Sequence, residues 1–143
     1  MNAARLVGLM FGVVLSACAS TSGATGGSGN GEGDSWLSVC GRIARVSFEC
    51  PEDYVDTVLS IEAERAPGGQ KPPSSVRADR LRLLREQRDE PPEEQERRCS
   101  AEGERLQGRM PSGVENLGAC EQKAACSLKV KCLRPLLEAR PTG

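Results

Sequence analysis

Cysteine is the residue type whose number and spacing in this chain could support chemistry. The 143 residues hold seven cysteines and no histidine. One cysteine stands near the N-terminus, and the other six are Cys40, Cys50, Cys99, Cys120, Cys126 and Cys132. Zinc sites and thiol redox sites favour CxxC pairs, which this chain lacks, and without histidine no mixed Cys/His site can form. We therefore expect the six to form disulfides, and we expect no metal site.

The composition also limits enzymatic chemistry. Because histidine is absent, neither a Ser-His-Asp triad nor a Cys-His pair can form. No glycine-rich phosphate loop lies between a predicted strand and a predicted helix. A pair of carboxylates for glycoside hydrolysis stays open, since acidic residues are numerous, but no pair stands out by its spacing. We predict that the protein is not an enzyme and that it needs no cofactor.

The N-terminal segment has the pattern of an export signal. Arg5 precedes ten uncharged, mostly apolar residues (6–15), which are too few to span a bilayer as a helix. Two small residues, Ser16 and Ala17, follow, and Cys18 comes directly after them. An ordinary secretory signal that precedes a cysteine by chance is the alternative interpretation.

The run Leu15-Ser16-Ala17-Cys18 resembles the lipobox of bacterial lipoproteins. The resemblance implies cleavage between Ala17 and Cys18, a diacylglyceryl thioether on Cys18 and an acyl chain on its new amino group. Residues 1–17 would then be a signal peptide, and the acyl chains would hold the protein stably on membrane lipid. Because Ala19 replaces the Asp that implies inner-membrane retention, the resemblance implies the outer membrane of a Gram-negative host. In a Gram-positive host it implies the outer face of the single membrane.

A glycine-rich segment follows the cysteine. Six of the sixteen residues in 19–34 are Gly, the others are mostly Ser, Thr and Ala, and no large apolar side chain occurs. Such a segment cannot bury enough apolar surface to become ordered. We interpret residues 18–34 as the lipidated cysteine and a flexible tether, whose reach as a Gly-rich coil is roughly 20–24 Å.

Residues 35–143 have the length of one domain. Their 18 Lys and Arg balance 18 Asp and Glu, which argues against nucleic acid as a partner and against a polybasic membrane patch. Leu, Ile, Val and Phe supply only 21 of these 109 residues, so the apolar core is small. Once Cys18 is set aside as lipidated, six cysteines remain, and in a protein outside the cytoplasm this even number predicts three disulfides. Each disulfide would stabilise the folded state by about 3–4 kcal/mol in the chain-entropy model.

Apolar residues recur at helical spacing. The alternation of apolar and polar residues that is typical of strands never extends over more than four residues. Prolines and glycines divide the helical stretches at 51, 67–69, 91–92 and 111–113. We expect helices over 36–48, from 51 to the break at 67, over 76–90, from 93 towards 110, and from 119 through 137. The sequence thus predicts an all-α, disulfide-stapled bundle of about four to five helices in residues 35–143.

The stretch 77–98 is strongly charged, with seven Arg and seven Asp or Glu. Its arginines could form a ridge for anionic lipid headgroups or phosphosugars: Arg77, Arg80, Arg82, Arg85 and Arg88. Because acidic residues are interspersed with them, we favour a solvated helix face whose charges cancel locally.

Helix geometry suggests the disulfide connectivity. If the turn at 111–113 folds the fourth helix back along the last one, residues whose numbers sum to about 224 face each other. Cys99 and Cys126 then lie within the Cα separation that a disulfide tolerates. We therefore predict a Cys99–Cys126 bridge.

The four other cysteines then pair between two helices. Cys40 and Cys50 would lie about 15 Å apart on one helix, and Cys120 and Cys132 about 18 Å apart on another, so neither pair can bond internally. Antiparallel packing gives Cys40–Cys132 with Cys50–Cys120, which we predict. Parallel packing would give Cys40–Cys120 with Cys50–Cys132.

These inferences define three classes of function. The prediction is an envelope-anchored lipoprotein that acts as a structural, assembly or interaction accessory, with other envelope proteins as partners. The alternative is a disulfide-stapled binding or inhibitor module directed at an envelope or extracellular enzyme. A hydrolase with an unrecognised carboxylate site is the third class.

Overall fold

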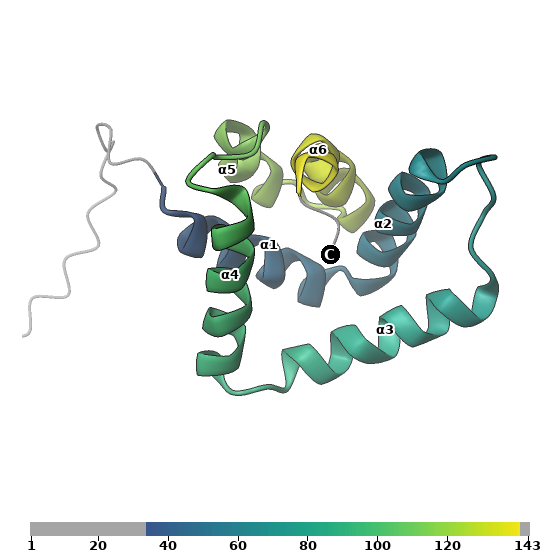
Figure 1. Cartoon of the computed structure of the whole chain (residues 1–143), viewed down its shortest axis with the longest axis horizontal. Helices are drawn as coiled ribbons and strands as arrows, with labels where there is room; N and C mark the ends of the chain where they lie inside the picture. The colour runs from purple at the N-terminus through teal and green to yellow at the C-terminus, as the bar shows by residue number, and fades with distance from the viewer. Residues whose placement is uncertain (1–33, 141–143) are drawn as a thin grey trace, which may run out of the picture. The chain divides into compact units, whose positions relative to one another are not determined.

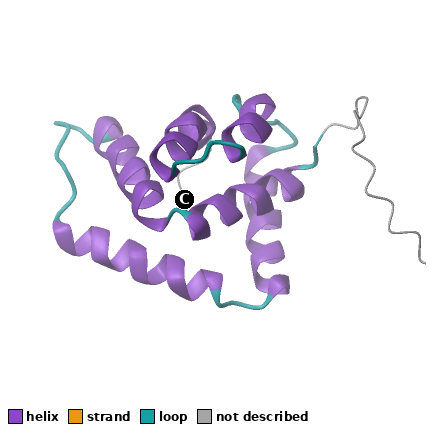
Figure 2. Cartoon of the chain, turned by 180° about the vertical axis from the view of Figure 1, so that it is seen from behind, coloured by secondary structure: helices purple, strands orange, loops and turns teal. Residues whose placement is uncertain are grey.

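The computed structural model describes residues 34–140, and these fold into helices joined by loops, with no strand in that range (Figures 1 and 2). The prediction of an all-α, disulfide-stapled bundle is confirmed. The predicted signal peptide 1–17, Cys18 and the tether up to residue 33 lie outside the described residues. Within residues 34–140, no helix combines the length and the apolar character that crossing a membrane requires.

Helix α1 (Trp36–Glu49) packs against α2, α3, α4 and α6 and is the central element of the bundle. It begins after Ser35, whose hydroxyl accepts a hydrogen bond from the backbone N–H of Ser38 at 3.3 Å. Such a cap satisfies one of the N–H groups that a helix start leaves without a partner. Its buried face includes Val39, Ile43 and Val46, at the spacing of one helix face.

Helix α2 (Pro51–Arg65) follows α1 after a single residue, and α3 (Ser74–Arg88) returns along it after a loop. Pro51 begins α2 where its missing N–H costs nothing, and acidic residues fill the first turn. A small apolar cluster joins the two helices; its buried members are Val55, Leu59, Leu81 and Leu84. The cluster is separate from the main core, so α3 is an outlying element, as Figure 1 shows.

Helix α4 (Pro92–Leu106) packs on α1. Gly103 lies so close to the ring of Trp36 that a Cβ at this position would be 2.9 Å from Cδ1. The helix ends at Leu106 because Gln107 adopts the left-handed conformation, with φ of 51°. It is therefore shorter than the predicted 93–110 stretch, and it does not form the predicted hairpin with the last helix.

The predicted last helix is two helices. A short 3₁₀ turn (Val114–Asn116) leads into α5 (Leu117–Glu121), and α6 (Cys126–Ala139) begins after a turn. α6 continues through Pro135, as expected. The main apolar core lies where α1, α5 and α6 meet, with Ile61 from α2. Leu117 on α5 and Val130 on α6 are fully buried there.

The structure pairs the six cysteines as Cys40–Cys99, Cys50–Cys126 and Cys120–Cys132, with Cα atoms 5.7, 5.4 and 5.4 Å apart. The predicted pairs Cys99–Cys126, Cys40–Cys132 and Cys50–Cys120 are therefore wrong, and so is the parallel alternative.

Two differences in packing explain the correction. First, α4 packs on α1 and not along the last helix, so Cys99 meets Cys40. Second, the break at 122–125 folds α5 back on α6, which brings Cys120 close to Cys132. A distance of about 18 Å between those two cysteines holds only for a continuous helix.

Candidate functional site

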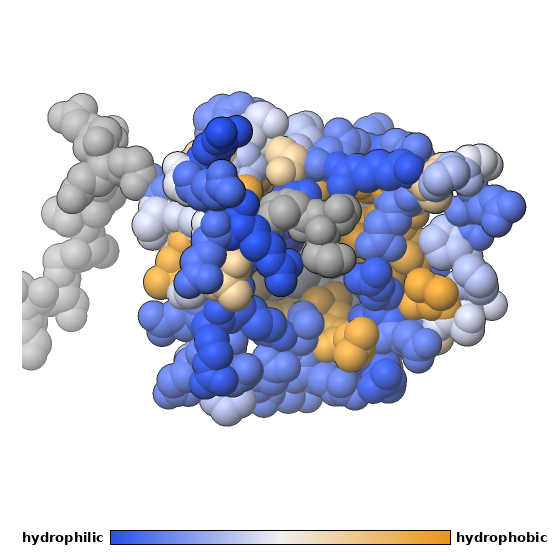
Figure 3. Space-filling view, in the orientation of Figure 1, coloured by the Kyte–Doolittle hydropathy of each residue, from blue (hydrophilic) through white to orange (hydrophobic). Residues whose placement is uncertain are grey.

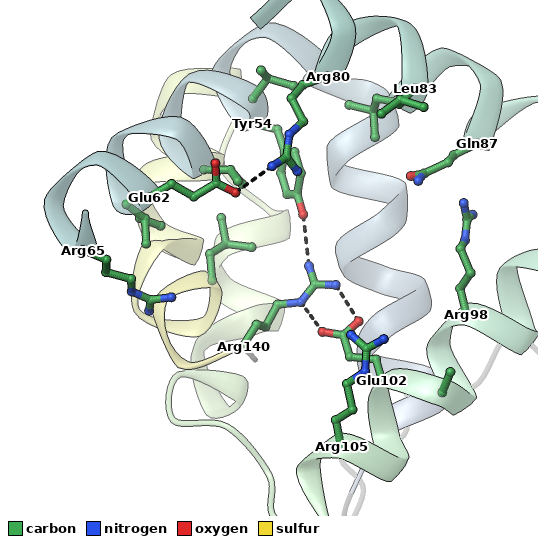
Figure 4. Close-up of a pocket in the computed structure, with 16 residues that line it drawn as sticks. Tyr54, Glu62, Arg65, Arg80, Leu83, Gln87, Arg98, Glu102, Arg105 and Arg140 are labelled. Carbon is green, nitrogen blue, oxygen red and sulfur yellow. Dashed lines mark hydrogen bonds and ion pairs between the residues drawn. The ribbon is translucent and has the colours of Figure 1, made fainter. Parts of the chain in front are cut away.

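A groove of about 480 Å³ lies between α2, α3 and α4 and reaches Arg140 just after α6 (Figure 4). Its apolar side chains are Val55, Val58, Ile61, Leu83, Leu84, Ala101 and Leu137. Its charged side chains are Glu62, Arg65, Arg80, Arg98, Glu102, Arg105 and Arg140. Figure 3 shows apolar residues at the surface in this part of the molecule, surrounded by hydrophilic ones. The volume lies within the range of natural small-molecule sites.

Helical periodicity turns these side chains towards one another. The α4 lining residues Arg98, Ala101, Glu102 and Arg105 have the i, i+3, i+4, i+7 spacing of one helix face. The α3 lining residues Arg80, Leu83, Leu84 and Gln87 have the same spacing. On α2, the lining residues run from Tyr54 through Val58 to Arg65 at helical intervals. Three helix faces therefore converge on one space.

Arg140 lies in the middle of the groove and links three segments (Figure 4). Its guanidinium donates two hydrogen bonds to the Glu102 carboxylate, at 2.6 and 2.7 Å, and a third to the Tyr54 hydroxyl at 3.0 Å. The side chains of Arg140 and Glu102 are only 23% and 16% exposed. This bidentate pair joins α4 to the end of α6, and the Tyr54 contact joins both to α2.

The protonation of Arg140 follows from these neighbours. Burial alone would lower the pKa of the guanidinium, but its hydrogen bonds to Glu102 and to the Tyr54 hydroxyl, together with the negative charge of Glu102, raise the pKa above its ordinary value. Arg140 is therefore a permanent cation that the protein has already neutralised with a carboxylate.

The other four arginines surround this centre. Arg80 pairs with Glu62 at 3.0 Å, and Arg98 lies 2.9 Å from a carboxylate oxygen of Glu90. Arg65 donates to a backbone carbonyl, that of Glu138, and to no carboxylate within residues 34–140. In the same range, no acidic side chain lies within ion-pair distance of Arg105.

The ridge of arginines considered for 77–88 is largely neutralised. Arg77 pairs with Glu52 and Asp56, and Arg80 pairs with Glu62, so these two hold α3 to α2. Arg82 pairs with Glu86, and Arg88 pairs with Asp89. Four of the five arginines are thus neutralised by acidic side chains that lie beside them. Of the five, only Arg80 lines the groove.

The side chains of the groove are suited to binding a ligand. Both of its carboxylates, Glu62 and Glu102, accept hydrogen bonds from arginine, and the six cysteines of the described chain are in disulfides. No group of three potential metal ligands gathers within residues 34–140. Guanidinium groups beside apolar side chains are suited to hold an anion with an apolar portion.

Sequence reasoning missed the central residues of the groove. It identified arginines in 77–88 but not Tyr54, Glu102 or Arg140, which lie on three separate segments. The spacing of Arg98, Glu102 and Arg105 on one helix face was a local signal for part of the set. Nothing local connects that face to Arg140, 38 residues after Glu102.

We compared the chain with protein-family models, with curated proteins and with solved structures, and none of the three comparisons found a match.

Proposed function

We propose that the chain is an envelope lipoprotein, acylated at Cys18, whose helical domain acts as a non-catalytic interaction or assembly accessory. The observation that carries this proposal is the pairing of cysteines. Six of the seven are joined in three disulfides, which supports folding in an oxidising compartment. The seventh is Cys18, the position at which a lipobox places the acyl acceptor.

Two further observations support a binding role for the domain. Its groove combines an apolar lining with arginines, and the carboxylates there are engaged in ion pairs and are not exposed as an acid–base pair. The tether predicted in 18–34 would let the domain contact partners close to the membrane. With Ala19 after the lipidated cysteine, the proposed location in a two-membrane cell is the outer membrane.

The anchor is tested by the variant Cys18→Ala in the full chain. Because the thiol accepts the diacylglyceryl group, we expect the variant to lack acyl mass and to be recovered as an uncleaved or a soluble species, which detergent partitioning with mass spectrometry distinguishes. Ser22→Ala, four residues further along, is the matched control and should behave as the wild type. A wild-type mature chain that begins at a residue other than Cys18, or that lacks acyl mass, would overturn the proposal.

The partner class is tested by cross-linking in intact cells, followed by purification from solubilised envelopes. An accessory should be recovered with integral or lipid-anchored envelope proteins, and the Cys18→Ala variant should lose them. Recovery of one soluble hydrolase in stoichiometric amounts would instead favour the inhibitor module.

A further inference from the structure

We propose that the groove between α2, α3 and α4 binds a single-chain anionic lipid, with its phosphate head among the arginines and its acyl chain along the apolar side chains. The idea deepens the proposed function, because an envelope anchor would place the groove beside a membrane that supplies such lipids. Three features of the groove lead to this ligand: its charge balance, its apolar lining and its size.

The charge balance favours an anion. Five arginines line the groove and only two glutamates do. Glu102 neutralises Arg140, and Glu62 neutralises Arg80. Arg65 and Arg105 have no carboxylate partner within residues 34–140, so the groove carries positive charge that its own side chains do not balance. Guanidinium groups recognise phosphate by charge-assisted, often bidentate hydrogen bonds.

The lining favours an apolar chain attached to that anion. Leu83 on α3 is 43% exposed, one of the few large apolar side chains that the bundle leaves open. It lies in the groove with Val58 of α2 and Leu137 of α6. A free phosphate would leave the exposed part of Leu83 in water, and a neutral chain would leave Arg65 and Arg105 without an anionic partner. A ligand with both parts satisfies both sets of residues.

The size favours a small ligand over a protein. The groove is a recess of about 480 Å³ between three helices. That volume is typical of sites for small molecules. We therefore assign the groove to a lipid molecule and not to a partner helix.

Native mass spectrometry of the mature full chain, purified in a neutral maltoside detergent, tests the assignment with three related probes. Palmitoyl lysophosphatidic acid has head and chain, monopalmitoylglycerol lacks the phosphate, and glycerol 3-phosphate lacks the chain. We expect one retained molecule of the first and none of the others. The same spectrum reports the acyl mass on Cys18, so failure of the anchor and failure of the groove are seen separately.

Variants at exposed positions locate the binding. Arg105→Gln and Arg65→Gln should each weaken binding about threefold to fivefold, the effect of removing one partly exposed ion pair. Arg97→Gln is the matched control on α4, because Arg97 is 72% exposed and pairs with Glu94 outside the groove. It should change affinity by less than about twofold, a difference below the energy of one such ion pair.

The apolar part is tested by Leu83→Asn against Leu128→Asn. Both leucines are exposed, but Leu128 lies on α6 outside the groove. Only the Leu83 variant should lose lysophosphatidic acid.

Several results would overturn the proposal. Equal retention of monopalmitoylglycerol would mean that the arginines do not contribute, and equal retention of glycerol 3-phosphate would mean that the apolar lining does not. Equal effects of the groove and control variants would place the lipid elsewhere. Charge-dependent binding to phosphatidylglycerol vesicles, without binding of dispersed lysolipid, would indicate a membrane-facing patch in place of a ligand groove.

Discussion

The bridge between Cys40 and Cys99 decides whether α4 remains on α1, and so whether the groove exists. Cys99 is the only buried residue of α4, and the two apolar clusters of residues 34–140 contain no α4 side chain. The non-covalent contacts of α4 include Gly103 against the Trp36 ring and the Glu102–Arg140 pair. We predict that removing the bridge releases α4 while the rest of the bundle stays folded.

The size of the effect follows from the loop that the bridge closes. Its cysteines are 59 residues apart in sequence, and a disulfide across such a loop is worth about 4 kcal/mol in the chain-entropy model. That free energy corresponds to about a thousandfold change in an equilibrium constant. In the double variant Cys40→Ala/Cys99→Ala, amides of α4 should therefore exchange hydrogen up to about a thousandfold faster. Amides at the centre of α6 should keep their protection, because the main core and two bridges remain there.

Hydrogen exchange measured by mass spectrometry on the full chain distinguishes the segments. Cys120→Ala/Cys132→Ala is the control, since that bridge closes a span of 12 residues, which is worth about 3 kcal/mol. It should accelerate exchange in α5 and leave α4 unchanged. If α4 keeps wild-type protection without the Cys40–Cys99 bridge, the non-covalent contacts suffice and the reasoning is wrong.

Two further predictions concern stability. Gly113 has φ of 93°, and a Cβ there would lie 3.0 Å from the backbone nitrogen of Leu136 in α6. Gly113→Ala should therefore cost about 2 kcal/mol or more in urea unfolding. Gly118→Ala, inside α5 with room for the methyl group, should be neutral or stabilise by up to about 1 kcal/mol; equal effects of the two would refute the strain argument. The hydrogen bonds and charge of Arg77 hold the pKa of Asp56 below its usual 3.8. The ion pair between Asp56 and Arg77 therefore stabilises the fold fully above pH 3.8, and this stabilisation is lost as the pH falls through the lowered pKa of Asp56. Urea unfolding from pH 6 to 2 should show a smaller acid loss in Asp56→Asn than in the wild type, and an unchanged slope would contradict the pairing.

Several features of the fold could be predicted because they depend on neighbouring residues. The first helix was expected over 36–48 and spans Trp36–Glu49, since the apolar period and the capping Ser35 are local signals. Prolines at positions 51 and 92 begin α2 and α4 as their fixed φ favours. The even number of cysteines in the domain predicted three bridges without any knowledge of their partners.

The break between α5 and α6 could not be predicted in this way. Residues 122–125 read Gln-Lys-Ala-Ala, all of which are compatible with a helix. The chain bends there because folding back buries Leu117 in the main core and joins Cys120 to Cys132. Complete burial of one leucine is worth about 1.5–3 kcal/mol, which exceeds the weak preference of four residues for continuing the helix.

The sequence by itself therefore determined the helical class, most helix starts and the number of disulfides, because each rests on contacts within a few residues. Only the tertiary structure decided which cysteines pair and which side chains share the groove. Those outcomes depend on which helix faces meet, and Glu102 meets Arg140 and Tyr54 through packing between segments that no local pattern connects. The same packing leaves Arg65 and Arg105 beside an open apolar surface, where the proposed ligand would bind.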